Sequence, residues 1–289
     1  MSSVGPIIFG EVLFDTFPDG VKHLGGAPFN VAWHLQAFGD QPLFLSSVGN
    51  DENGDEIIRA MQQWGMSVAD VQRTSEYSTG QVDVSFNDGE PAYDIATNRA
   101  YDNIATEQLP ELVASKLLYH GTLALRNKES RNTLDRLLAR QPIPVFLDVN
   151  LRAPWYQKTD VCEWLQRAYW VKLNQHELAE LAPAGDTLQQ QLEALQQQSD
   201  IELVVVTRGE QGAIARRRDG QQWQVQPAAS ISVVDTVGAG DAFTARLIHG
   251  LLHKEEVDAA LLAAQAFASR IVAMRGAVPL AKDFYKLTQ

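Results

Sequence analysis

The feature that most constrains the fold of this 289-residue chain is the alternation of short, fully apolar runs with stretches of helical periodicity. The clearest apolar runs are Ile7–Phe9, Val145–Leu147 and Leu203–Val206, and polar or glycine-rich residues and a helical pattern follow each of them. Uninterrupted apolar runs of this length are typical of strands that are buried on both faces of a sheet. We therefore predict an α/β fold with three layers, in which helices cover both faces of a doubly wound, mostly parallel sheet.

The helical patterns lie between these runs across most of the chain. We expect helices at residues 30–38, 55–64, 130–140, 177–181, 188–198 and 257–274. Two stretches alternate with period two instead: residues 82–95, with a turn at Asn87–Gly89, and residues 213–226, with a turn at Asp219–Gly220. Both are predicted hairpins. The first can serve as a lid over a ligand or can be an edge hairpin without function.

Charge and composition exclude several classes of protein. The formal net charge is −12, and nucleic-acid or anionic-membrane binding requires a basic face that such a chain does not provide. The single cysteine excludes an internal disulfide. The start of the chain lacks a basic region before an apolar core, and the apolar stretch 259–269 is too short to cross a bilayer. We expect a cytoplasmic protein.

The segment Val234–Phe243 places two glycines and an acid where a strand is expected to give way to a helix. Gly238 and Gly240 allow a sharp turn and a close approach of the backbone to a ligand. Amides that open a helix point outward at its positive end, which is a site for phosphate. Asp241 stands beside these amides, where it can accept the proton of an attacking hydroxyl. An N-cap role for Asp241, with the glycines forming only a tight turn, explains the segment equally well.

A second glycine pair lies in Gly25–Ala32, between the first strand and the first helix. Asn30, close to the start of that helix, offers a donor and an acceptor. Asp15 follows the first strand, and parallel sheets bind ligands at the carboxyl ends of their strands. A carboxylate and an amide suit a polyol, although a turn and a helix cap explain the same residues.

Three further segments follow strands and are expected at the same edge of the sheet. They are Asp148–Arg152, Lys172–Glu177 and Thr207–Gly212. Asn174 and Glu177 can hold a hydrated magnesium ion through water, or can form a capping box. The glycine-containing Thr207–Gly212 can face nucleotide phosphates.

Other templates are missing from the sequence. It contains no Walker-type G-x-x-x-x-G-K-[ST] loop, no third glycine of a dinucleotide fingerprint and no G-x-S-x-G elbow. We also expect no zinc spacing among the six histidines and a packed core role for His34.

The chain resembles the ribokinase-like (PfkB) carbohydrate kinases over nearly its whole length, and among them the bacterial fructokinases most. Asp235–Asp241 matches the family signature D-T-x-G-A-G-D, and Gly25–Ala32 matches G-G-A-P-x-N-V-A. Two matches in the correct order, some two hundred residues apart, are far more specific than either alone. Lys172–Glu177 resembles the N-x-x-E element, and Thr207–Gly212 resembles the T-x-G-x-x-G nucleotide loop.

The resemblance implies an ATP-dependent sugar kinase and roles for individual residues. Asp241 would be the base, and the amides of Gly238, Ala239 and Gly240 would stabilise the transferring phosphoryl group. Asp15, Gly26, Asn30 and Arg152 would bind the sugar. Lys172, Asn174, Thr207, Gly209, Gly212 and Gln265 would bind ATP. Glu177 would hold Mg²⁺ through water, and Asp235 and Thr236, with the backbone around Arg275 and Gly276, would bind K⁺. The two signature motifs are then expected to converge on one site.

The resemblance also bears on organisation. We expect a single domain over residues 1–289, with a small β lid from segments around 12–24 and 80–100, and a homodimer through that lid. The span from Asp15 to Gly25 is shorter than in many fructokinases, which leaves both the lid and the sugar open.

Fructose is the first expectation for the substrate. Arg99, Arg126 and Arg152 can instead pair with a carboxylate, as a 2-keto-3-deoxygluconate kinase requires, or can form structural ion pairs. Another sugar or nucleoside kinase, a non-catalytic sugar or nucleotide sensor, and a dinucleotide oxidoreductase are the remaining hypotheses.

Overall fold

The structure is a computed structural model that describes residues 5–87, 90–109, 115–140, 142–227 and 233–286. The chain divides into two compact units: residues 1–115 with 124–142, and residues 116–123 with 143–289. Each unit is described by itself below. No helix among the described residues is both long and apolar enough to span a membrane.

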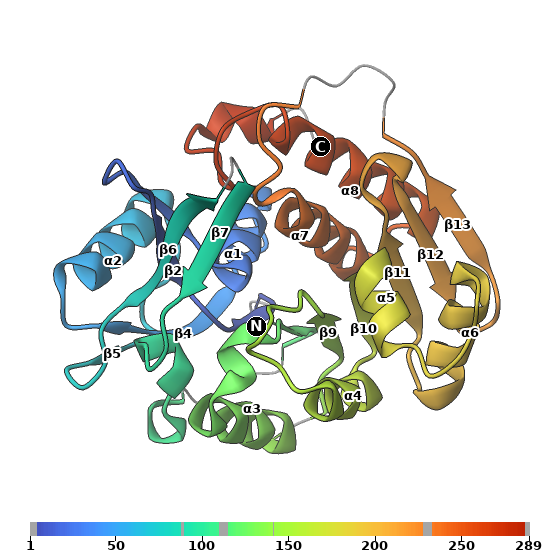
Figure 1. The fold of residues 1–289 in the computed structure, drawn as a ribbon, viewed down its shortest axis with the longest axis horizontal. Helices are drawn as coiled ribbons and strands as arrows, with labels where there is room; N and C mark the ends of the chain where they lie inside the picture. The colour runs from blue at the N-terminus through green and yellow to red at the C-terminus, as the bar shows by residue number, and fades with distance from the viewer. Residues whose placement is uncertain (1–4, 88–89, 110–114, 141, 228–232, 287–289) are drawn as a thin grey trace. The chain divides into compact units, whose positions relative to one another are not determined.

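The first unit contains a parallel sheet and a second, smaller sheet (Figure 1). Its elements are β1 (Ile7–Phe9), β2 (Leu13–Thr16), β3 (Lys22–Gly25), α1 (Ala27–Phe38), β4 (Leu43–Gly49), α2 (Glu52–Trp64), β5 (Val71–Thr74), β6 (Gly80–Asn87), β7 (Glu90–Ile95) and α3 (Lys128–Arg140), with 3₁₀ turns at Ala100–Asn103 and Thr106–Gln108. β4 pairs in parallel with both β1 and β5.

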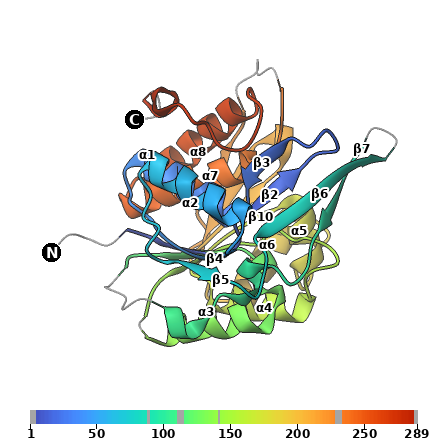
Figure 2. The same cartoon turned by 90° about the vertical axis from the view of Figure 1, so that its left-hand side faces the viewer.

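The smaller sheet has the strand order β3-β2-β6-β7. β2 pairs antiparallel with β3 and parallel with β6, and β6 pairs antiparallel with β7 (Figure 2). The predicted hairpin at residues 82–95 is therefore confirmed, while its turn residues Asp88 and Gly89 lie outside the described residues. The segment between Asp15 and Gly25 forms a hairpin of its own, whose turn closes through Phe17 N–H and Val21 O.

The second unit contains six neighbouring strands in the order β13-β12-β11-β10-β9-β8. Its elements are β8 (Leu118–His120), β9 (Val145–Asp148), α4 (Lys158–Arg167), β10 (Trp170–Asn174), α5 (Gln175–Leu181), α6 (Leu188–Gln198), β11 (Leu203–Thr207), β12 (Ala213–Arg217), β13 (Gln222–Val225), α7 (Ala239–Leu252) and α8 (Val257–Ile271), with 3₁₀ turns at Gly209–Gln211 and Lys282–Tyr285. Strands β8 to β11 are parallel, and β12 and β13 add antiparallel at one edge, as the pattern at residues 213–226 predicted.

The helices form where the sequence places apolar stripes, but three expectations about them need correction. α1 and α2 each begin three residues earlier than expected, because Pro28 is suited to a first turn and Asp51 caps α2. Helix α4 was not among the predicted helices, although Val161, Trp164 and Leu165 are buried at helical spacing. α8 ends at Ile271 instead of residue 274.

The early end of α8 has a physical cause. The carbonyl of Val272 accepts hydrogen bonds from the backbone N–H groups of Val234 (2.8 Å) and Asp235 (3.2 Å). The chain leaves the helix here, and these bonds attach the segment before α7 to the end of α8. The beginning of α7 is thus anchored within the second unit.

Candidate active site

The N-terminus of α7 is built as an anion-binding turn. Gly238 is the N-cap residue and has left-handed backbone angles, with φ of 77°. A Cβ atom at this position would lie 2.4 Å from the Cβ of Ala277, so only glycine fits. The predicted helix is confirmed, but the N-cap interpretation of Asp241 is wrong. Asp241 lies inside the first turn, three residues after the N-cap, where the first amides of a helix have no partner within the helix itself.

Asp235 fixes the segment that leads into this turn. Its Oδ1 accepts a hydrogen bond from the N–H of Val237 (3.0 Å), and its Oδ2 accepts one from the N–H of Gly276 (3.0 Å). The structure thus brings together Asp235 and the backbone near Arg275 and Gly276, as a shared ion site would require. Thr236, the other predicted K⁺ ligand, is exposed. An ion at this place stays a prediction.

The corner between β10 and α5 is a capping box. Asn174 Oδ1 accepts from the N–H groups of His176 and Glu177, and Glu177 Oε2 accepts from Asn174 N–H at 2.7 Å. The other oxygen of Glu177 accepts from Leu151 N–H at 2.8 Å, so this buried carboxylate also holds the loop after β9. The capping-box interpretation is confirmed. Each Glu177 oxygen keeps a second lone pair, which suits contact with a hydrated metal through water.

Lys172 has a protein partner that sequence analysis did not identify. Its ammonium lies 3.0 and 3.2 Å from the two carboxylate oxygens of Asp148, and both side chains are buried. Burial alone would lower the pKa of Lys172, but attraction by Asp148 and Glu177, the hydrogen bond to Asp148 and attraction by Asp241 together raise it. The ammonium therefore stays protonated. The register of β9 and β10, which pairs these two residues, could not be read from the sequence.

The Thr207–Gly212 loop folds back on itself at the end of β11. Arg208 N–H donates to Gly212 O (2.7 Å), and Gly212 N–H donates to Gly209 O (3.0 Å). Gly212 has a φ of 76°, and a Cβ there would overlap the carbonyl oxygen of Val225, so packing alone requires this glycine. Gly209, with a φ of 55°, has open space around its Cβ position, which a ligand can approach.

Two of the predicted ATP-site residues lie on elements that contact β12, namely β11 and α8. Thr207 ends β11 and pairs with Ala213 of β12. Gln265 lies on α8, which packs against β12 and β13. Its amide nitrogen is 3.4 Å from the hydroxyl oxygen of Ser269, and the side chain is half-buried. Adenine contact by Gln265 stays a prediction.

In the first unit, Asp15 lies against the glycine pair. Asp15 is on β2, and its Oδ2 is 3.1 Å from the position that a Cβ of Gly25 would occupy, so a side chain there would crowd the carboxylate. Gly26 is the N-cap of α1 with φ of 106°, and Asn30 lies in the first turn that follows, 4% exposed. The structure thus groups Asp15, Gly25 and Gly26, and it places the Asn30 amide one helical turn beyond them. The two signature motifs lie in different units, so their convergence stays a prediction.

The arginines considered for a substrate carboxylate differ in their surroundings. Arg126 donates from Nε and Nη2 to the two oxygens of Asp102, at 2.7 and 2.8 Å. Nη2 also bonds Ala96 O and the hydroxyl of Tyr101. Arg126 therefore has a structural ion pair, and its side chain is 8% exposed. Arg152 is exposed, and its guanidinium donates a hydrogen bond to the neighbouring carbonyl of Leu151.

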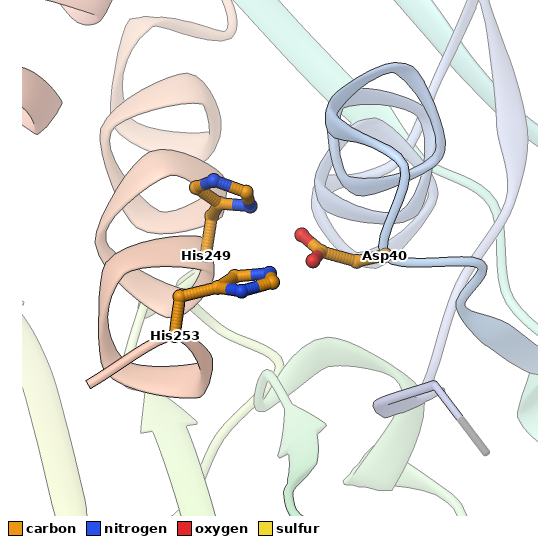
Figure 3. A group of neighbouring side chains, drawn as sticks. All are labelled: Asp40, His249 and His253. Atoms are coloured by element: carbon orange, nitrogen blue, oxygen red, sulfur yellow. The ribbon is translucent and has the colours of Figure 1, made fainter. Parts of the chain in front are cut away.

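The opposite end of α7 carries two histidines (Figure 3). His249 and His253 have ring centroids 4.5 Å apart and ring nitrogens within 4.8 Å of each other. They lie four residues apart on one helix face, a spacing that helical zinc ligands use, so the expectation of no such spacing was wrong. Two imidazoles are half of a tetrahedral zinc set, and the pair carries no metal assignment. Figure 3 also draws Asp40, which follows Gly39 after α1 in the first unit. His34 is fully buried in α1, as predicted.

Comparison with known proteins decides the family. Residues 9–283 match the pfkB family of carbohydrate kinases. The chain belongs to the pfkB carbohydrate kinase family. A fructokinase of Salmonella typhimurium is 30% identical over 261 residues, which cover 84% of this chain and 83% of that protein. The pfkB signatures recognised in the sequence are therefore confirmed, and the protein is an ATP-dependent carbohydrate kinase that phosphorylates a sugar hydroxyl.

Solved structures support the ribokinase-like fold. A fructokinase from Vibrio cholerae O395, in a form bound to fructose, ADP and calcium ion, superposes with a TM-score of 0.86 at 23% identity and covers all of both chains. An aminoimidazole riboside kinase from Salmonella enterica, complexed with aminoimidazole riboside and an ATP analogue, superposes with a TM-score of 0.83 at 22% identity, over 96% of this chain and 97% of that one. The same pfkB fold thus serves more than one acceptor.

Proposed function

We propose that this pfkB kinase is a fructokinase, which transfers the γ-phosphoryl group of ATP to a primary hydroxyl of fructose. The observation that carries the proposal is the 30% identity with a bacterial fructokinase over most of both chains. The two polyol-binding residue types, Asp15 and Asn30, with their glycine pair, are consistent with a neutral sugar. A carboxylate and an amide offer acceptors and donors to adjacent hydroxyls without requiring a charge on the ligand.

In this proposal Asp241 accepts the proton of the attacking hydroxyl. Asp241 lies in the first turn of α7, which follows the amides of Gly238, Ala239 and Gly240. The Ala239 N–H also donates a hydrogen bond to Thr236 O at 3.3 Å. These amides, at the positive end of the helix dipole, stabilise charge on the transferring phosphoryl group. A positioned base contributes roughly 10²–10⁴-fold to such a reaction.

The residues proposed to bind the nucleotide phosphates and the metal lie at the ends of β10 and β11 in the second unit. Thr207, Gly209 and Gly212 would face the ATP phosphates, with Gln265 near the base. Glu177 and Asn174 fit a hydrated Mg²⁺ only through its waters, because both side chains already bond backbone N–H groups. Mg²⁺, when bound with ATP, neutralises charge on the phosphates. We also propose that Asp235 and Thr236 bind K⁺, as the resemblance to the family implies.

Two further parts of the proposal rest on the resemblance. The smaller sheet, built from β3, β2, β6 and β7, is a lid, and a second copy of the chain pairs with it to form a homodimer. The protein acts in the cytoplasm on a free sugar. Size-exclusion chromatography with light scattering tests the dimer, and a monomer at all concentrations would contradict it.

The structure gives one of the three arginines considered for a sugar acid, Arg126, a structural partner instead. A 2-keto-3-deoxygluconate kinase needs a cation for the carboxylate, and Arg126 is already bidentate to Asp102. Removing a guanidinium from such a pair would leave a buried carboxylate without compensation. Arg126 is therefore better explained as part of the first unit's structure.

A coupled ADP-release assay over a substrate panel tests the proposal. The panel contains fructose, ribose, 2-keto-3-deoxygluconate, fructose 6-phosphate and a nucleoside, each with MgATP. We expect the highest kcat/KM for fructose. A higher value for any other acceptor would leave the family assignment intact and overturn fructose as the substrate.

A further inference from the structure

Three buried polar side chains from three elements of the second unit meet below the first turn of α7. Asp148 ends β9, Lys172 lies on β10, and Thr244 lies on α7. Asp148 and Thr244 are 0% exposed and Lys172 is 7% exposed. The Thr244 hydroxyl is 2.7 Å from Asp148 Oδ2, and the Lys172 ammonium is 3.0 Å from Asp148 Oδ1. One carboxylate thus holds both a neighbouring strand and the helix.

The carboxylate has full compensation for its burial. A buried carboxylate is costly unless hydrogen bonds and an opposite charge satisfy it. Asp148 accepts from an ammonium and from a hydroxyl, and charge-assisted bonds of this kind are short and strong. The attraction of Asp148 helps keep Lys172 protonated against its burial, as the raised pKa of Lys172 indicates. The arrangement is therefore a fixed ionic contact.

The contact between Asp148, Lys172 and Thr244 also lies next to Gly240, whose amide is part of the proposed site. Thr244 Oγ1 is also 2.9 Å from the carbonyl oxygen of Gly240, four residues earlier in α7. The Lys172 ammonium lies 3.4 Å from the position that a Cβ of Gly240 would occupy. The carboxylate of Asp148 and the ammonium of Lys172 therefore lie next to the first turn of α7, on the side that faces strands β9 and β10. Through Thr244, Asp148 is thus linked to the turn that carries Gly240 and Asp241.

We propose that Asp148 is a positioning residue, which sets the first turn of α7 for phosphoryl transfer by binding the Thr244 hydroxyl and the Lys172 ammonium. This inference rests on the proposed role of Asp241. Asp148 does not touch the reacting atoms in this proposal and acts through the other two side chains. Errors of about 1 Å in the placement of reacting groups cost up to roughly 10²-fold in rate. The contact therefore affects kcat more than substrate affinity.

Thr244 provides the cleanest test, because two substitutions separate its hydroxyl from its volume. Thr244→Val removes the hydroxyl and keeps the shape, and Thr244→Ser keeps the hydroxyl. We expect Thr244→Val to lower kcat about 10- to 100-fold, with KM for the sugar changed less than about threefold, and Thr244→Ser to retain most of kcat. Assays at a temperature where circular dichroism shows both variants folded separate this effect from lost stability. An unchanged kcat in Thr244→Val, or an equal loss in Thr244→Ser, would overturn the proposal.

A double-mutant cycle tests whether Asp148 is the residue through which Thr244 acts. We expect Asp148→Asn and the double variant Asp148→Asn/Thr244→Val to have nearly the same kcat, because the second substitution removes a contact that is already weakened. If the fold losses of kcat in the two single variants multiplied in the double variant, Asp148 and Thr244 would act independently and the proposal would be refuted. If Asp148→Asn does not fold, the Thr244 pair still decides.

The outcome is distinguishable from failure of the proposed function. Near-normal turnover in Asp241→Asn would show that Asp241 is not the base. A lower kcat in Thr244→Val would then have to come from a structural change and not from the position of Asp241. Impaired turnover in Asp241→Asn with normal turnover in Thr244→Val would retain the base and remove the positioning role.

Discussion

At the scale of single residues, two glycines with nearly the same φ angle differ in how closely other residues pack against them. Gly238 and Gly276 have φ of 77° and 79°. A Cβ on Gly238 would overlap Ala277, whereas a Cβ on Gly276 would meet nothing within 4 Å. The conformation is thus a shared requirement, and the close packing belongs to Gly238 alone.

This difference predicts unequal effects of alanine. Gly276→Ala should lower the free energy of unfolding by about 1 kcal/mol through backbone strain. Gly238→Ala adds a steric overlap at the start of α7 and should cost about 3 kcal/mol, with a lower kcat as well. Urea unfolding and steady-state assays of both variants measure this. Equal losses of stability would show that packing against Ala277 contributes nothing.

The sequence predicted some of these residue-level features and could not predict others. A glycine in a turn before a helix is visible as a pattern, so Gly238 and Gly26 were identified. The partnership of Asp148 with Lys172 depends on the register of two strands, and register is set by tertiary packing. Thr244 looked like one polar residue in an apolar helix, and nothing near it in the sequence indicated a partner 96 residues away.

At the scale of elements, the N-terminus of α2 shows how one acid joins a helix to a strand. Asp51 Oδ1 accepts from Gly54 N–H (2.8 Å) and the Thr79 hydroxyl (2.6 Å), and Oδ2 accepts from Thr79 N–H (2.8 Å). Desolvation by partial burial acts to raise the pKa of Asp51, but these hydrogen bonds and attraction by Arg73 together lower it below its ordinary value of 3.8. The ionised form is therefore favoured in the folded state.

A depressed folded pKa gives stability at high pH. The contribution of Asp51 is fully present above its unfolded value of 3.8 and is lost as pH falls through the lower folded value. Asp51→Asn keeps an oxygen that can cap α2 but removes the charge and replaces Oδ2, the acceptor for Thr79 N–H, so it should destabilise the protein at pH 7 by about 1 kcal/mol. The difference from the unsubstituted protein should shrink at acid pH. Chemical unfolding at a series of pH values measures both.

Asp70 provides a control with the opposite sign. Partial burial raises its pKa, so the ionised form is disfavoured in the folded state. Its charge destabilises the fold above its folded pKa, and Asp70→Asn should be neutral or stabilising at pH 7. If both variants lost the same stability with the same pH dependence, the hydrogen bonds of Asp51 would not be the cause.

Prediction from sequence was also uneven at this scale. Helix α6 was located to the residue, and its apolar spacing and Thr187 cap define its bounds. The α4 stripe was short and interrupted by Cys162 and Glu163, and it was overlooked. The parallel pairing of β2 with β6 joins residues 67 positions apart, such as Leu13 and Gly80, and no local pattern encodes such a pairing.

At the scale of the whole molecule, the α/β class and the mostly parallel strands followed from the alternation of apolar runs and helical patterns. The division into two compact units could not be predicted in this way. After residues 116–123 of the second unit, the chain returns to the first unit over residues 124–142, which contain helix α3. No shift of composition marks that return.

Sugar binding should be visible as a change in the stability of the whole protein. A ligand that binds only the folded state at 100 times its Kd stabilises it by about 2.7 kcal/mol. We expect fructose to raise the Tm, and Asp15→Asn to abolish most of that rise with little change in Tm without sugar.

The exposed Asp94 of β7, in the same small sheet, is the matched control. Asp94→Asn should keep the full rise in Tm with fructose. An undiminished rise in Asp15→Asn would show that Asp15 does not bind the sugar.

The measurement that most directly tests the central claim is the turnover of Asp241→Asn with fructose and MgATP. The account predicts that kcat falls by roughly 10²–10⁴-fold while fructose binding and Tm are kept. Asp258→Asn, which changes an exposed acid in the first turn of α8, controls for the loss of a helix-terminal charge and should turn over normally. Near-normal turnover in Asp241→Asn would contradict the assignment of Asp241 as the base.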